Sequence, residues 1–171
     1  EAGIRVIGPN CMGLYVPEEN MTFMDGFPTE AGNVLLLAQS GSNARAIILG
    51  LARRGIRFSK VISFGNGADL DSHDFFDYAS SDPNTEFVVA YIESISAGRD
   101  LLEALKRCAR VKPTIILKGG INPAGTRAAN SHTGALSGSA DIFEALCRQT
   151  GAIRAETIDS LQDLLITVST T

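Results

Sequence analysis

The 171-residue sequence contains no tryptophan, and aromatic residues make up only 6% of it. So few rings are available to sandwich a flavin that a flavin-binding protein is a disfavoured interpretation. No apolar run approaches the roughly 20 residues that a membrane-spanning helix needs, so we expect no transmembrane segment. The chain also has no charged stretch followed by an apolar core and a small-residue cleavage site, and we expect no secretory signal.

Cysteine and clustered positive charge are scarce as well. Three widely spaced cysteines do not suggest a disulfide framework, so a reducing, cytoplasmic setting is expected. Cys108 and Cys147 stand within apolar helical patterns, where a free cysteine behaves as a small buried hydrophobe. Fifteen Lys and Arg against nineteen Asp and Glu give a net charge of -4, and the basic residues are scattered. Nucleic acid is therefore not an expected partner.

Apolar residues make up 44% of the chain, enough for the core of one globular domain. Short β-branched or leucine-rich runs alternate with longer segments of helical period, which is typical of βαβ units. The sequence therefore predicts a three-layer α/β/α fold, a flavodoxin-like doubly wound sheet of five parallel strands with helices on both faces. The expected strands are 34–38, 60–64, 87–92, 114–118 and 153–155, the expected helices are 43–54, 72–80, 98–110, 140–150 and 160–168, and a separate short strand is expected at 4–7.

Ligands of open parallel sheets bind beyond the carboxyl ends of the strands, so the residues that follow each strand are informative. Ser40, Gly41 and Ser42 follow the first sheet strand and open a helix, whose free N–H groups and positive end can hold a phosphate. A serine–glycine turn that only caps a helix is the other interpretation. Glu93 follows the run 87–92, where a carboxylate is costly without a cation or hydrogen-bond donor beside it.

A segment without helical or strand pattern separates the strand at 114–118 from the helix near Ala140, and a connection of that length is usually functional. Small residues surround His132 within it. A lone histidine is more often structural, but this setting above the ligand-binding edge favours chemistry. Together with Glu93 and the helix start, it suggests phosphoryl transfer: the imidazole attacks phosphorus, the carboxylate orients the ring, and the helix end holds the phosphoryl group.

At these residues the sequence resembles the NDP-forming acyl-CoA synthetases, a family that includes the α subunit of succinyl-CoA synthetase. The resemblance implies interconversion of acyl-CoA, phosphate and ADP with acid, CoA and ATP, through an acyl phosphate and a phosphohistidine. The motif at 131–134, Ser-His-Thr-Gly, is most similar to the branch of ADP-forming acetyl-CoA synthetases. The motifs that carry the resemblance lie at 7–13, 39–42, 63–69, 92–93, 112–113 and 131–134.

The resemblance also implies roles for single residues. His132 matches the histidine that is phosphorylated, and Glu93 matches the carboxylate that hydrogen-bonds it. Residues 40–42 match the start of the helix that steadies the phosphoryl group. Asn10 and Cys11 match a Gly-Pro-Asn-Cys turn near the CoA thiol and the acyl group. No metal ligands are assigned within this chain.

In the family, a Rossmann-type CoA-binding domain precedes this turn, and an ATP-grasp domain or subunit binds the nucleotide with Mg²⁺. We therefore expect residues 1–30 to be the tail end of such a CoA-binding domain with a connecting segment, and residues 31–171 to be the succinyl-CoA-ligase-like flavodoxin-like domain. The expected ligands are CoA, ATP or ADP, phosphate and a small carboxylic acid. As a separated domain, the chain is expected to be inactive alone and to self-associate through exposed docking surfaces.

Two further interpretations come from different functional classes. A non-catalytic sensing domain, like those fused to protein acetyltransferases, would share the fold, but a sensor has no need of the nucleophile His132. A hydrolase using Ser40 or Ser131 with that histidine is disfavoured, because no Gly-x-Ser-x-Gly turn follows any strand. The identity of the acyl group stays open, because its pocket is shared with other domains.

Overall fold

The strands of the computed structural model, which describes residues 3–120 and 140–170, form one sheet in the order β1-β3-β2-β4-β5-β6. Every pairing from β3 to β6 is parallel, and β1 runs antiparallel to β3 at the edge. The strands are β1 (Gly13–Tyr15), β2 (Val34–Ala38), β3 (Phe58–Ser63), β4 (Phe87–Ile92), β5 (Thr114–Lys118) and β6 (Ile153–Ala155). The helices are the 3₁₀ turn η1 (Pro17–Glu19), α1 (Gly41–Ala52), α2 (Ser72–Ser81), α3 (Gly98–Val111), α5 (Ala140–Thr150) and α6 (Ile158–Ser169).

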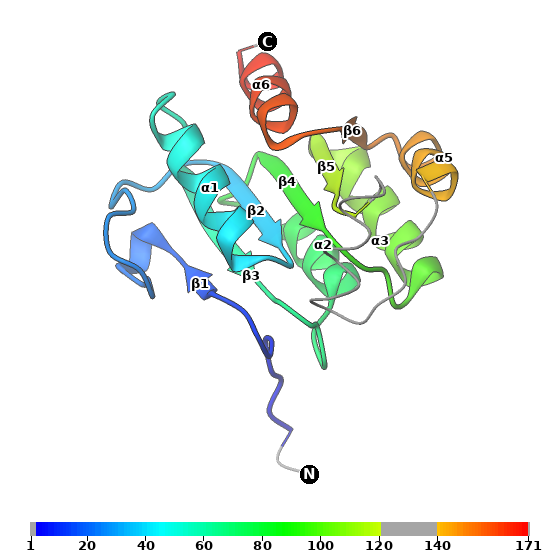
Figure 1. Cartoon of the computed structure of the whole chain (residues 1–171), viewed down its shortest axis with the longest axis horizontal. Helices are drawn as coiled ribbons and strands as arrows, with labels where there is room; N and C mark the ends of the chain where they lie inside the picture. The colour runs from blue at the N-terminus through cyan, green and yellow to red at the C-terminus, as the bar shows by residue number, and fades with distance from the viewer. Residues whose placement is uncertain (1–2, 121–139, 171) are drawn as a thin grey trace.

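Helices cover the sheet on both faces, as the layers in Figure 1 show. Ile47 of α1 and Leu161 of α6 belong to the core on one face, and Phe76 of α2, Leu105 of α3 and Phe143 of α5 belong to the core on the other. Because both faces are covered, β2 and β5 are buried at every residue, which explains their nearly continuous apolar sequences. Cys108 and Cys147 are buried, as expected.

The predicted three-layer, flavodoxin-like fold is confirmed, with one strand more than the five expected. The additional strand, β1, has only three residues and includes Gly13, so no apolar period marks it. Its pairing with β3 is decided by tertiary contact rather than by local sequence.

The strand expected at 4–7 is wrong. Ile4 is 76% exposed and Val6 is 51% exposed, and this segment lies outside the sheet. It runs along the loop after β3 instead: the Val6 N–H donates to Asp69 Oδ2 at 2.6 Å, and the Leu70 N–H donates to the Val6 carbonyl at 3.3 Å. Main-chain hydrogen bonds and the Arg5–Asp69 ion pair, rather than strand pairing, therefore hold this N-terminal segment against the loop.

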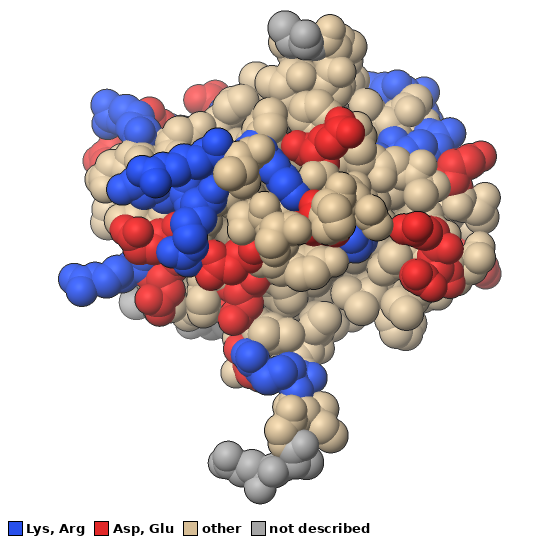
Figure 2. Space-filling view, turned by 180° about the vertical axis from the view of Figure 1, so that it is seen from behind, with Lys and Arg blue, Asp and Glu red and all other residues tan. Residues whose placement is uncertain are grey.

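The surface carries charges of both signs. In Figure 2 the face seen from behind shows basic and acidic side chains interspersed. Between α2 and α3, for example, Arg107 donates two hydrogen bonds to the carboxylate of Asp77, at 2.8 and 2.9 Å. Within the described ranges, none of the helices combines the length and the apolar character that crossing a membrane requires.

Candidate functional site

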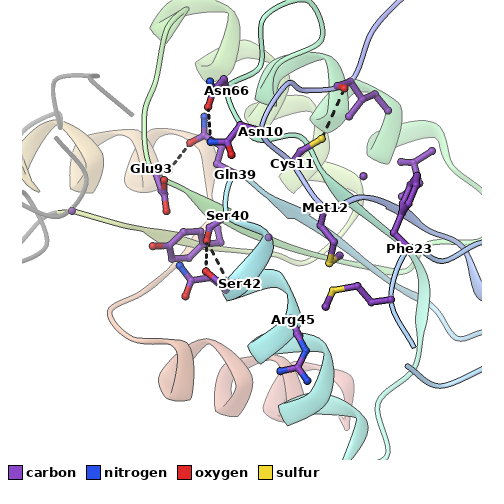
Figure 3. A pocket seen from close by; sticks show the side chains of 18 of the residues that line it. Asn10, Cys11, Met12, Phe23, Gln39, Ser40, Ser42, Arg45, Asn66 and Glu93 are labelled. Carbon is purple, nitrogen blue, oxygen red and sulfur yellow. Dashed lines mark hydrogen bonds between the residues drawn. The ribbon is translucent and has the colours of Figure 1, made fainter. Parts of the chain in front are cut away.

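A cavity of about 1400 Å³ opens at the carboxyl ends of β2 and β4. These two strands are neighbours in the sheet, but the chain leaves β2 through α1 on one face and reaches β4 through α2 on the other. Such a reversal is where doubly wound sheets bind ligands. Six of the seven predicted site residues line this cavity, and several are labelled in Figure 3. They are Asn10, Cys11, Ser40, Gly41, Ser42 and Glu93; the seventh, His132, lies outside the described residues.

The start of α1 forms one wall of the cavity. Ser40 is the N-cap, and its Oγ accepts the Asn43 N–H at 3.3 Å and lies 3.1 Å from the Ser42 Oγ. The helix therefore begins at Gly41, two residues earlier than expected, and the first N–H groups of a helix have no partner within it. A Cβ at Gly41 would stand 3.2 Å from the Cβ of Met12, so glycine lets the two segments approach closely. Two hydroxyl groups and a helix N-terminus at a cavity can hold a phosphate.

Glu93 also lines the cavity, immediately after β4, and is half-buried. Its neighbour on the same side of the strand is Tyr91, which also lines the cavity. Burial, followed by the charge of Glu93 and a hydrogen bond with it, raises the pKa of Tyr91 to about 12. The phenol therefore stays protonated at neutral pH and serves as a donor to the carboxylate. Tyr91 is thus a neighbour of Glu93 that sequence analysis missed within an apolar run, although the i, i+2 spacing could have revealed it.

The turn that carries Asn10 and Cys11 is paired with the loop after β3. The Asn66 N–H donates to the Pro9 carbonyl at 3.0 Å, and Asn10 Nδ2 donates to Asn66 Oδ1 at 3.4 Å. Gly65 has φ +54°, and a Cβ there would stand 2.3 Å from the carbonyl oxygens of Pro9 and Asn10. Two motifs more than fifty residues apart thus form one structural unit, which presents Asn10 and Cys11 to the cavity.

Comparison with known protein families agrees with the flavodoxin-like fold described above. Residues 31–168 match the family model of the succinyl-CoA ligase like flavodoxin domain. The chain belongs to this family.

Known relatives of this succinyl-CoA ligase-like domain are ligases of larger size. Acetate–CoA ligase (ADP-forming) I of Archaeoglobus fulgidus is 39% identical over 166 residues, which are 96% of this chain and 24% of the relative. The α subunit of acetate–CoA ligase (ADP-forming) II of Pyrococcus furiosus is 40% identical over 159 residues, which are 93% of this chain and 35% of the relative. The chain therefore spans about a quarter to a third of the length of these relatives.

A solved structure resembles the domain closely. It is the dinucleotide-forming acetyl-coenzyme A synthetase 1 of Candidatus Korarchaeum cryptofilum in complex with phosphate and ADP, which matches with a TM-score of 0.85 and 35% identity. The match covers 94% of this chain and 35% of that one.

The remaining wall of the cavity in this ligase-like domain is apolar with a basic rim. Met12, Phe23 and Met24 supply apolar side chains, and Arg5 and Arg45 supply positive charge. Among residues 3–120 and 140–170, there is no group of three or more His, Cys, Asp or Glu side chains that could hold a metal ion. The described part of the site therefore offers anion-binding and apolar groups around one carboxylate.

Proposed function

We propose that this chain is the flavodoxin-like domain of an ADP-forming acyl-CoA synthetase, in which a phosphoryl group passes through His132. The observation that carries the proposal is the meeting of three segments at one cavity: the start of α1 at Ser40–Ser42, the carboxylate of Glu93 and the turn with Asn10 and Cys11. The names of the relatives, which are ADP-forming acetate–CoA ligases, support the same reaction class.

In the proposed reaction, a phosphate oxygen attacks the thioester carbonyl of acyl-CoA, the C–S bond breaks, and CoA leaves as a thiolate that takes up a proton. A neutral ring nitrogen of His132 then attacks the phosphorus of the acyl phosphate, and the carboxylic acid leaves as its carboxylate. The phosphoryl group finally passes to a terminal oxygen of ADP, which forms ATP and frees the histidine. Each step runs in both directions.

Glu93 would accept a hydrogen bond from the second ring nitrogen of His132 and so stabilise the positive charge that develops on the imidazole. The N–H groups at the start of α1 and the hydroxyls of Ser40 and Ser42 would hold the charged phosphoryl oxygens. Contacts within the chain hold both groups, because the Ser40 Oγ accepts the Asn43 N–H and the Glu93 N–H donates to Gln39 Oε1.

The remaining ligands are assigned by the same proposal. CoA would place its thiol near Asn10 and Cys11, and a small carboxylic acid, with acetate as the first candidate, would occupy the neighbouring space. ADP or ATP with Mg²⁺ would bind mainly to an ATP-grasp domain or subunit, and residues 1–30 would lead from a Rossmann-type CoA-binding domain. The large part of the relatives that this chain does not span supports such partners. Three free cysteines fit a cytoplasmic setting.

ATP formation by the complete protein tests the proposal. It is supplied with ADP, phosphate, Mg²⁺ and a panel of short, branched, aromatic and dicarboxylic acyl-CoA thioesters. We expect ATP from at least one of them, and a fall of about 10²-fold or more in the Glu93→Gln variant. Glu86→Gln is the matched control, because Glu86 is exposed, lies outside the cavity lining and accepts a hydrogen bond from Asn33 through its carboxylate. A wild-type protein that binds acyl-CoA but forms no ATP would instead be a sensing domain.

A further inference from the structure

The main chain of Glu93 is held by a buried side chain on its N–H side. Gln39 follows β2 and is only 7% exposed. Its Oε1 accepts the N–H groups of Glu93 and Ser94, at 2.5 and 2.8 Å, and its Nε2 donates to Ser94 Oγ at 3.1 Å. One amide side chain thus uses both of its ends on a single turn, the turn that carries the carboxylate of the site. Figure 3 shows Gln39 beside Glu93.

A second buried side chain holds the carbonyl side of the same residue. Lys118 ends β5 and is 3% exposed. Its Nζ donates to the carbonyl oxygens of Glu93 and Gly119, at 2.7 and 2.8 Å. Burial lowers the pKa of this ammonium group, and the nearby charge of Glu93 raises it in part. An ammonium is costly to bury without partners, and both acceptors of Lys118 Nζ lie at this edge of the sheet.

The position of these two side chains has a structural reason. β4 ends at Ile92, so Glu93 lies beyond the regular ladder, where main-chain groups lose their strand partners. Gln39 and Lys118 replace those partners from the two strands that flank β4. A leucine or a methionine would fill the same space without the cost of burying polar atoms, so the polar side chains are explained by the turn that they hold.

We propose that Gln39 and Lys118 are positioning residues, which clamp the main chain of Glu93 and so hold its carboxylate in place at the cavity; this inference rests on the proposed function. Because Ser40 follows Gln39 directly, the same side chain also ties the turn of Glu93 to the start of α1. The clamp therefore keeps the orienting carboxylate and the anion-binding helix end at a constant spacing, so that both can act on one phosphoryl group in the cavity.

The test uses the complete protein with Gln39→Leu and Lys118→Met, each alone and combined with Glu93→Gln. We expect each single variant to slow phosphorylation of the protein by ATP about 10- to 100-fold, the effect of a slightly misplaced catalytic group. In the Glu93→Gln background neither should slow it further, because both residues act through that carboxylate. Gln162→Leu is the matched control, since Gln162 is a buried glutamine of α6 outside the cavity lining, and we expect its rate to stay unchanged.

Hydrogen exchange supplies a readout that does not depend on activity. In Gln39→Leu the amides of Glu93 and Ser94 should exchange at least about tenfold faster than in wild type, because their acceptor is gone. Unchanged exchange, or rate effects that multiply with that of Glu93→Gln, would overturn the clamp. Faster exchange in a protein whose wild type is not phosphorylated at all would leave the clamp in place and overturn the proposed function instead.

Discussion

Replacing Gly65 by alanine should destabilise the chain much more than the same change at Gly55. Both glycines have positive φ, +54° and +83°, so each alanine variant costs about 1–2 kcal/mol for the left-handed conformation. At Gly55 nothing lies within 4 Å of the added Cβ, so the conformational cost is the only one expected. At Gly65 the Cβ would stand 2.3 Å from two main-chain oxygens, those of Pro9 and Asn10, which cannot rotate away. Forcing the two segments apart adds about 1–3 kcal/mol.

Urea unfolding of the two variants, followed by circular dichroism, measures this difference. With a slope of about 1–3 kcal/mol per molar urea, an extra cost of about 2 kcal/mol lowers the midpoint of Gly65→Ala by about 1 M relative to Gly55→Ala. Equal midpoints would refute the reasoning, because they would mean that the loop after β3 does not hold the turn of Asn10.

Three further predictions concern the core and the charged groups. Phe76→Ala should lower the free energy of unfolding by about 3–5 kcal/mol in urea titrations, because this ring of α2 is fully buried. Burial, the largest single cause, raises the pKa of Asp82, but the Lys60 ammonium and the Thr85 hydroxyl, each at 2.6 Å, together with the Asn84 N–H hold that pKa below its ordinary 3.8. The stability from these contacts is therefore present above pH 3.8 and lost as the pH falls through the folded-state pKa. In Asp82→Asn the urea midpoint should fall less at low pH than in wild type. A midpoint that falls as steeply as in wild type would contradict the assignment. In Glu93→Gln, the pKa of Tyr91 read from tyrosinate absorbance should fall from about 12 yet stay above 10.0, because burial, the largest cause, remains.

The central strands could be predicted from the sequence residue by residue. β2, β4 and β5 have the predicted bounds because strands covered on both faces are nearly continuous apolar runs, a signal that needs no knowledge of neighbours. β1 and the segment 4–7 could not be predicted, since a three-residue edge strand has no period and an apolar run does not reveal what it packs against. In both segments, tertiary contacts rather than local propensity determine the structure.

Much of the candidate site was also accessible from the sequence, because Ser40 and Glu93 each follow a strand and such residues meet at one sheet edge. Tyr91, Gln39 and Lys118 were not recognised as partners of Glu93. The acceptors and donors of Gln39 and Lys118 are mostly main-chain groups, which every residue possesses, so only the topology reveals which ones they reach.

The most direct test of the account is the position of the phosphoryl group after the complete protein is incubated with radiolabelled ATP and Mg²⁺. This chain contains two histidines, so His73→Asn serves as a matched control for His132→Asn. We predict an acid-labile, base-stable label on the peptide that contains His132, absent from this peptide in His132→Asn and retained in His73→Asn. A wild-type protein that binds CoA but leaves this peptide unlabelled would contradict the account.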